Sequence, residues 1–118
     1  MSKSVLINTD IRGILMTGSL PVQVFLLSLK KLCTDKRNIV LVHRQKNTQD
    51  MLRLNLTLSD IQSVCRSLTP SDLKEGPCAD DNGSPEPVWI FLRRYKEVSL
   101  YVKLKIVNGK LLVLSFHE

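Results

Sequence analysis

The C-terminal part of the chain alternates between apolar and polar positions, which is the pattern of β-strands. Residues 98–107 and 110–117 form two such runs around Asn108 and Gly109. Because both turn residues tolerate positive φ, this arrangement predicts a β-hairpin. Side chains spaced by two along a strand leave it on the same face. The first strand therefore has an apolar face and a basic face, and the basic face carries Tyr101, Lys103 and Lys105.

The sequence leaves two registers open for this hairpin. A two-residue turn pairs Val107 with Lys110, whereas a three-residue loop with Gly109 in a G1 bulge pairs Ile106 with Lys110. The bulged register gathers the apolar side chains of both strands on one face, and burial of that set normally selects the register. We therefore predict the bulge, with Gly109 at positive φ. The face opposite the apolar set then carries Tyr101, Lys103, Ser115 and His117.

Two segments upstream have the three- and four-residue spacing of amphipathic helices. The first is predicted to begin at Ser19 and Pro21 and to end near Asp35. The second begins at a capping-box-like Thr57–Asp60 and ends before Pro70. Basic side chains gather at the end of the first helix, where cations complement the helix dipole. A solvated helix end and an RNA contact both account for that cluster.

The remaining segments complete an α+β pattern. Residues 39–42 and 88–95 predict strands, and residues 47–56 fit either a strand or a short helix. Residues 75–87 are rich in proline, glycine and acidic side chains, which predicts an exposed, mobile loop. Helices followed by three consecutive antiparallel strands predict two or three helices packed on one face of a small antiparallel sheet.

Length and charge indicate the number of domains and the kind of binding partner. The 118 residues suffice for one domain, which we place at residues 19–118 after a weakly patterned N-terminal extension at residues 1–18. That extension could add an edge strand or enlarge a partner interface. Lys plus Arg number 17 and Asp plus Glu number 11, so the net charge is +6. Such an excess favours a polyanionic partner such as nucleic acid.

Other features exclude some locations and chemistries. There is no apolar stretch long enough to span a membrane and no secretory signal, so we expect a cytoplasmic protein. Cys33, Cys65 and Cys78 lack the spacing of a zinc site and are expected to be reduced thiols, two of them in the core. With only His43 and His117 in the chain, we expect neither a catalytic metal nor another cofactor.

The order of these features resembles the MqsR family of bacterial toxins. The segments that carry the likeness are Leu68–Lys74 after the second helix, Val88–Trp89, and the hairpin strands Leu100–Leu104 and Leu112–His117. The match covers about residues 20–118 and is absent before them. The resemblance implies a RelE-like toxin fold and a metal-independent endoribonuclease that cuts mRNA. It also implies a type II toxin–antitoxin system, with a cognate antitoxin protein, MqsA-like or another, that holds the toxin inactive.

The resemblance assigns roles to single residues. It implies three catalytic residues: the family's catalytic tyrosine falls on Tyr101, its C-terminal lysine falls on His117, and a lysine beyond the second helix falls on or beside Lys74. A glutamine that follows the family's tryptophan is Ile90 here. Metal-independent cleavage by 2′-OH attack needs a base, an acid and cations for the phosphorane charge. Histidine suits proton transfer at neutral pH. We expect four cations to bind RNA: Lys103, Lys105, Arg93 and Arg94.

A simpler reading exists for each of these residues. Tyr101 could be a half-buried strand tyrosine and His117 a frayed terminal side chain. Trp89 and Phe91 are expected in the core more than as stacking platforms for bases. The alternative function is a non-catalytic basic RNA-binding or protein-interaction module, because phosphate-binding and phosphate-cleaving surfaces use the same residue types.

Overall fold

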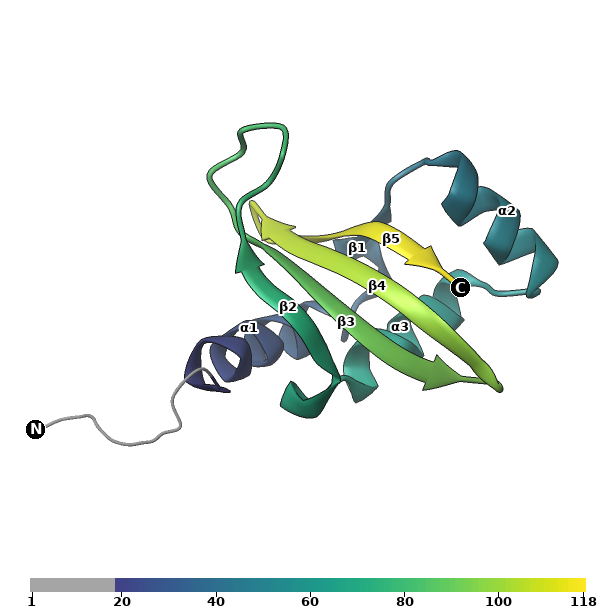
Figure 1. Cartoon of the computed structure of the whole chain (residues 1–118), viewed down its shortest axis with the longest axis horizontal. Helices are drawn as coiled ribbons and strands as arrows, with labels where there is room; N and C mark the ends of the chain where they lie inside the picture. Colours follow the sequence, from purple (N-terminus) through teal and green to yellow (C-terminus); the bar gives the residue numbers. More distant parts are fainter. Residues whose placement is uncertain (1–18) are drawn as a thin grey trace, which may run out of the picture.

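The structure is a computed structural model that describes residues 19–118, so the extension expected at residues 1–18 lies outside the described residues. Over the described range, three α-helices and a five-stranded mixed sheet confirm the α+β class. Figure 1 shows two of the helices behind the sheet and the third beside the most C-terminal strand. The helices are α1 (Ser19–Leu32), α2 (Gln45–Arg53) and α3 (Leu58–Ser67), with short 3-10 turns η1 (Lys36–Asn38) and η2 (Pro70–Asp72).

The five strands follow the order β1-β5-β4-β3-β2 across the sheet. Their bounds are β1 (Ile39–Leu41), β2 (Leu73–Cys78), β3 (Val88–Tyr95), β4 (Val98–Val107) and β5 (Lys110–His117). The expectation of a purely antiparallel sheet was wrong, because β1 runs parallel to β5. A three-residue strand carries too little pattern to reveal its direction, which is set by where the chain leaves α1.

Strand β2 was missed, because its residues lie mostly in the segment predicted to be a loop. It is an edge strand that pairs with β3, and its register shifts on both sides of Glu75. An edge position tolerates Pro77, which has no N–H to donate to a ladder. Gly76 has φ 148°, and a Cβ there would lie 3.0 Å from Cε3 of Trp89. The proline and glycine that suggested a loop therefore allow an irregular strand to pass close to the core.

One face of the sheet, here called the helix face, packs against α1 and α3 and carries the main core. Phe91, Val102 and Phe116 are fully buried on this face. The ring of Phe25 in α1 stacks on Trp89, with 4.8 Å between ring centroids. Trp89 and Phe91 are thus core residues, as predicted. The free thiols of two cysteines, Cys33 and Cys65, are buried there as well.

The opposite face of β2, β3, β4 and β5 is here called the open face, because neither α1 nor α3 covers it (Figure 1). A small apolar cluster of Val88, Ile90 and Leu114 packs on this side. The ambiguous segment at residues 47–56 is mostly the helix α2, which lies beside β5. Within residues 19–118, no helix is long and apolar enough to cross a membrane.

Candidate functional site

The register of the β4–β5 hairpin differs from the prediction at the turn. Val107 pairs directly with Lys110, so a two-residue turn with Asn108 at φ 51° and Gly109 at φ 72° replaces the expected G1 bulge. Only the positive φ of Gly109 is as predicted. The irregularity lies instead in the middle of β5, where the pairing shifts and leaves Leu114 as the extra residue. The predicted G1 bulge at the turn was therefore wrong, and the bulge at Leu114 was not predicted.

Burial explains why the bulge lies at Leu114. Near the turn, Leu111 and Val113 face the core, and beyond the bulge Phe116 faces it; all three are 0% exposed. Without an extra residue, a strand that buried Leu111 and Val113 would turn Phe116 to the open face, because side chains alternate. The bulge changes this alternation once, so both halves of β5 bury their largest apolar side chains.

The same shift assembles the predicted cluster on the open face. Beyond the bulge, Tyr101 pairs with His117 and Lys103 pairs with Ser115. Directly paired residues share a face and lie close together. The rings of Tyr101 and His117 stack, with centroids 5.4 Å apart and an angle of 13° between their planes. The grouping of these four side chains on one face is therefore confirmed.

Helix α2 holds the bulged end of β5 in place. Asn47 is 1% exposed, and its amide nitrogen donates to the carbonyl of Leu114 while its oxygen accepts from the N–H of Phe116. The N–H of Glu118 donates to a carboxylate oxygen of Asp50 at 2.7 Å. The backbone is thus anchored on both sides of His117, which argues against a frayed terminal side chain. The sequence alone does not reveal this role of Asn47, because Leu114 and Phe116 lie 67 and 69 positions away from it.

Two of the four predicted RNA-binding cations are neutralised. Lys105 forms an ion pair with Asp80 of the β2–β3 loop, and both side chains are largely buried. This contact lowers the pKa of the Asp80 carboxyl, chiefly through the hydrogen bond from Lys105. Arg93 pairs with Leu100 of the core, so it lies on the helix face, where it binds Asp72 at 3.1 Å. Neither cation is available at the Tyr101–His117 pair.

The other two cations lie on the open face beside the stacked rings. Lys103 follows Tyr101 by two positions, and Arg94 is exposed on β3 opposite Ser99. Neither has an ion-pair partner within the described residues. Side chains spaced by two on a strand are about 7 Å apart, so Lys103 lies about that far from Tyr101 along β4. The free positive charge of this face is therefore concentrated around Tyr101 and His117.

Lys74 and the position of the family glutamine lie on the neighbouring strands. Lys74 is exposed in β2, at the register shift opposite Ile90. Ile90 pairs with Lys103 and is 8% exposed, so it supplies apolar packing where the family has an amide. Leu92 pairs with Tyr101 and is 46% exposed. Leu92, Tyr101 and His117 therefore lie side by side across β3, β4 and β5. No local pattern distinguished Leu92 from the buried positions of β3.

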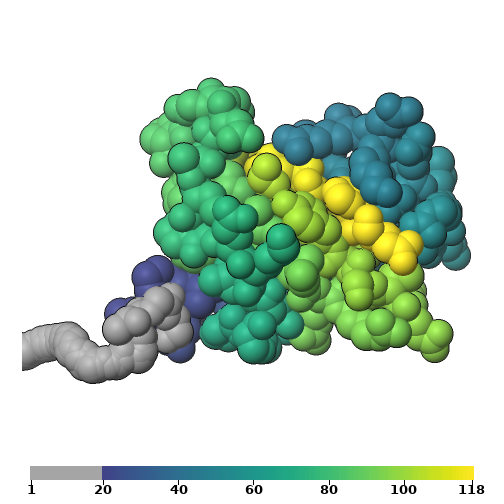
Figure 2. Space-filling model, in the orientation of Figure 1, coloured from purple at the N-terminus to yellow at the C-terminus, as the bar shows by residue number. Residues whose placement is uncertain are grey.

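The cluster lies in an accessible part of the surface. Figure 2 shows the yellow strand β5 and the green strand β4 exposed between the β2–β3 loop and α2. Tyr101 and His117 are each partly buried, and Tyr101 packs against the small apolar cluster beneath it. The arrangement places a phenol and an imidazole in stacked contact, with Lys103 two positions along β4 and Arg94 on the neighbouring strand β3.

Comparisons with known proteins do not assign this surface. No protein-family model matches the chain, and no curated protein matches it. Across residues 19–118, no three His, Cys, Asp or Glu side chains are grouped as metal ligands. The chemistry of the Tyr101–His117 pair is therefore inferred from its geometry and from the resemblance described above.

Proposed function

We propose that this protein is a metal-independent endoribonuclease that cuts mRNA at the Tyr101–His117 pair. The observation that carries the proposal is the stacked contact of these rings, with centroids 5.4 Å apart. Beside them on an accessible sheet face is Lys103, which has no ion-pair partner within residues 19–118. The resemblance to the MqsR family, with its RelE-like fold, supports the same function. Tyr101 and His117 are the residues to which both the geometry and the resemblance point.

The proposed reaction is an internal transfer at phosphorus. The ribose 2′-oxygen attacks the neighbouring phosphorus, the bond to the 5′-oxygen breaks, and a 2′,3′-cyclic phosphate and a 5′-hydroxyl result. A base must remove the 2′-OH proton and an acid must give a proton to the leaving 5′-oxygen. Imidazole groups serve as base or acid in many enzymes, so His117 would take one of these steps and the phenol of Tyr101 would take the other.

The cations of the open face have a separate role in this proposal. Lys103 lies beside the rings, where its charge would stabilise the negative charge that develops on the phosphorane. Arg94 and Lys74 lie farther out, on β3 and β2, and would hold neighbouring phosphates of the RNA backbone. Lys105 and Arg93 are not included, because Asp80 and Asp72 already neutralise them.

The same resemblance supports a toxin of a type II toxin–antitoxin system that acts in the cytoplasm. Its partner would be a cognate antitoxin protein, MqsA-like or another, that suppresses cleavage. Expression of the chain alone should then arrest growth, and co-expression of a small protein from an adjacent or overlapping reading frame should relieve the arrest. Growth that is unaffected by the wild-type chain would contradict the toxin assignment.

The activity is tested with the purified full-length chain and a 5′-labelled mRNA fragment in the presence of EDTA. We expect discrete cleavage products with 2′,3′-cyclic phosphate ends, and no such products from the same RNA with 2′-deoxy sugars. Retention of intact RNA in a salt-dependent gel shift, without cleavage, would favour the alternative of a non-catalytic basic module. Failure to bind or cleave RNA would contradict both functions.

A further inference from the structure

Helix α1 is apolar on the side that faces away from the core. Leu20, Val24 and Leu27 are 64%, 56% and 72% exposed. Their spacing of four and three places them on one helix face, opposite the buried Leu29 and Leu26. The exposed side of a surface helix is normally polar, so a row of three apolar side chains there is a feature of a binding surface. This stripe extends over about 10 Å of helix. Binding of a partner would remove its apolar side chains from water.

The stripe continues into a groove at the C-terminal end of α1. The groove has a volume of about 540 Å³ and lies between α1 and the β4–β5 turn. Leu32 and Ile106 give it an apolar lining, and Lys31 stands at its rim on the same helix face as Leu27. Ile106 packs with the main core, so the groove lies on the helix face and not beside Tyr101.

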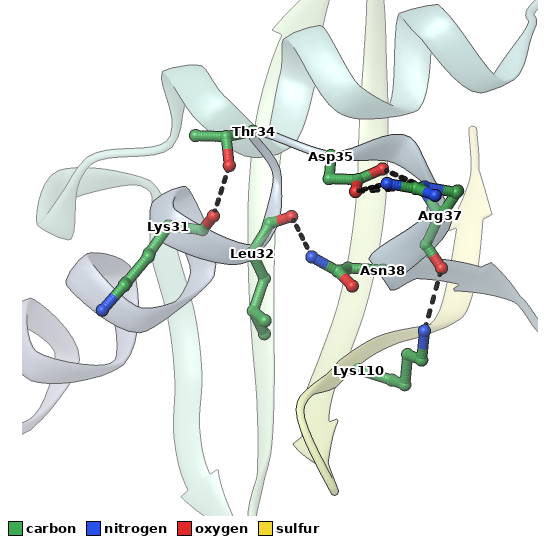
Figure 3. Close-up of polar contacts among 7 residues, drawn as sticks. All are labelled: Lys31, Leu32, Thr34, Asp35, Arg37, Asn38 and Lys110. Atoms are coloured by element: carbon green, nitrogen blue, oxygen red, sulfur yellow. Dashed lines mark hydrogen bonds and ion pairs between the residues drawn. The ribbon is translucent and has the colours of Figure 1, made fainter.

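A set of hydrogen bonds fixes the wall of this groove (Figure 3). Thr34 donates to the carbonyl of Lys31 at 2.8 Å, and Asn38 donates to the carbonyl of Leu32 at 3.1 Å. Lys110 of β5 donates to the carbonyl of Arg37 at 3.2 Å, which ties the hairpin to η1. Walls held by such contacts are preformed, so a ligand need not order them.

The charge around the groove is positive. Lys31 and Lys110 have no ion-pair partner within residues 19–118, and α1 contains no acidic residue. The nearby carboxylate of Asp35 is already held by Arg37 at 2.8 Å. A partner that covers the stripe and enters the groove therefore gains most if it brings carboxylates.

We infer that the stripe of Leu20, Val24 and Leu27, together with the groove, is the docking surface for an acidic amphipathic helix of a partner protein. Its apolar side chains cover the stripe, and its carboxylates meet Lys31 and Lys110. The surface does not depend on the proposed RNA cleavage, since it lies on the other side of the sheet from Tyr101.

Other occupants fit the surface less well. No aromatic side chain lines the groove, so an RNA base finds no stacking platform there. A second copy of this chain, with a net charge of +6, would bring lysines against lysines. Residues 1–18 contain Lys3, Arg12 and only one acidic residue, Asp10, so they do not supply the missing negative charge.

The test uses the full-length chain and a designed, fluorescein-labelled helical peptide of about 18 residues. Leucine recurs in it at every third or fourth position, and glutamate fills most other positions. A control peptide has lysine in place of each glutamate. Fluorescence anisotropy should show saturable binding of the glutamate peptide only. Equal binding of both peptides, or no binding of the glutamate peptide, would overturn the inference.

Variants locate the binding. The Val24→Ser/Leu27→Ser double variant should weaken binding by about tenfold or more, because two exposed apolar contacts are lost. Lys31→Glu should weaken it by about fivefold and flatten its salt dependence. The matched control is Leu52→Ser, which removes a leucine that is 78% exposed on α2 and should leave affinity unchanged. Thermal unfolding of each variant should be unchanged, since these side chains are exposed.

A photo-crosslink separates the possible occupants. With p-benzoylphenylalanine in place of Leu27, irradiation should join the chain to the glutamate peptide, and mass spectrometry should find the adduct on that peptide. In the presence of the peptide, crosslinks to residues 1–18 of the same chain, to a second copy or to added RNA would each overturn the inference.

Discussion

The open sheet face carries a lysine at each of two ends, and these lysines look equivalent in the sequence but have different surroundings in the structure. Lys103 and Lys105 occupy alternate positions of β4 and point to the same face. Lys105 is 5% exposed and bound to Asp80, whereas Lys103 lies beside the stacked Tyr101 and His117 without an ion-pair partner in the described part of the chain. Periodicity identifies which side chains share a face, but long-range pairing decides which of them can act on a ligand.

The bulge at Leu114 makes the corresponding difference in β5. Toward the turn, Lys105 pairs with Leu112, and beyond the bulge Lys103 and Tyr101 pair with Ser115 and His117. Together with the Lys105–Asp80 ion pair, this extra residue gives the open face an apolar, neutralised end and a polar, charged end. The charged end is where we place RNA cleavage, and each prediction below changes one end and leaves the other intact.

The largest effect is expected from removing the imidazole at the charged end. His117→Ala should slow RNA cleavage by about two to four orders of magnitude, because proton transfer loses its donor or acceptor. Single-turnover cleavage of a labelled RNA measures it. His43→Ala is the matched control, since it removes the only other histidine, and it should cleave at the wild-type rate.

Tyr101→Phe keeps the ring and its packing and removes only the hydroxyl. It should slow cleavage as well, which separates chemistry from stacking. Wild-type rates for both His117→Ala and Tyr101→Phe would place the active site elsewhere or rule out cleavage at this pair.

The next effect concerns the support of the charged end. Asn47→Ala removes three hydrogen bonds to the backbone, at Val42, Leu114 and Phe116, and leaves buried polar groups without a partner. The free energy of unfolding should fall by about 3 kcal/mol. Denaturant titration measures this loss. Gln49→Ala, at an exposed position of the same helix, should change it little, and an equal loss in both variants would contradict the role given to Asn47.

The two lysines should differ in their effect on RNA affinity. Lys103→Ala should weaken binding of a single-stranded RNA by about fourfold and reduce the slope of log affinity against log salt by about 0.7, because one phosphate contact is lost. Lys105→Ala/Asp80→Ala, which removes both partners of the neutral ion pair, should change neither. Binding measured over a range of salt concentrations checks this, and equal slopes for the two variants would remove the distinction between the ends.

A smaller effect should follow from releasing Lys105. Asp80→Asn should raise RNA affinity by about threefold and steepen the salt slope by about 0.7, because one more cation becomes available. Asp81→Asn makes the same change in net charge at an exposed neighbour and should raise affinity less. If both variants behave alike, net charge alone accounts for the gain.

The same pair gives a pH dependence with a definite sign. The pKa of Asp80 is lowered in the folded protein by Lys105, so the pair stabilises the fold above the ordinary carboxyl range near about pH 4. This contribution is lost as the pH falls through the lowered pKa. The difference in unfolding free energy between wild type and Asp80→Asn should therefore shrink as the pH is lowered from about 6 to about 3. A difference that grows with acid would contradict the pairing.

Local patterns predicted much of this fold. The spacing of apolar residues located α1 and α3, the capping box placed the start of α3 at Thr57, and the Asn108–Gly109 turn located the hairpin. What they did not predict depends on distant contacts. Strand β2 is stabilised by pairing with β3 and packing near Trp89, although its own proline and glycine suggest a loop.

In the candidate site, too, local patterns predicted some features, and others depend on distant contacts. The alternation of β4 brought Tyr101, Lys103 and Lys105 together, and the faces of Ser115 and His117 were correct although the bulge was placed wrongly. Asp80, Asp72 and Asn47 decide which cations are free and how His117 is held, and each contacts residues far away in the sequence. No local pattern could have selected them.

The central claim is that RNA binds at the Tyr101–His117 pair, and the two histidines of the chain allow a direct measurement. The ring protons of His43 and His117 give two NMR signals, assigned with the alanine variants, and the full-length chain is titrated with an RNA made uncleavable by 2′-deoxy sugars. The account predicts that the His117 signal shifts and saturates with RNA, while the His43 signal moves much less. A shift confined to His43, or no shift of either signal under conditions where the RNA binds, would contradict it.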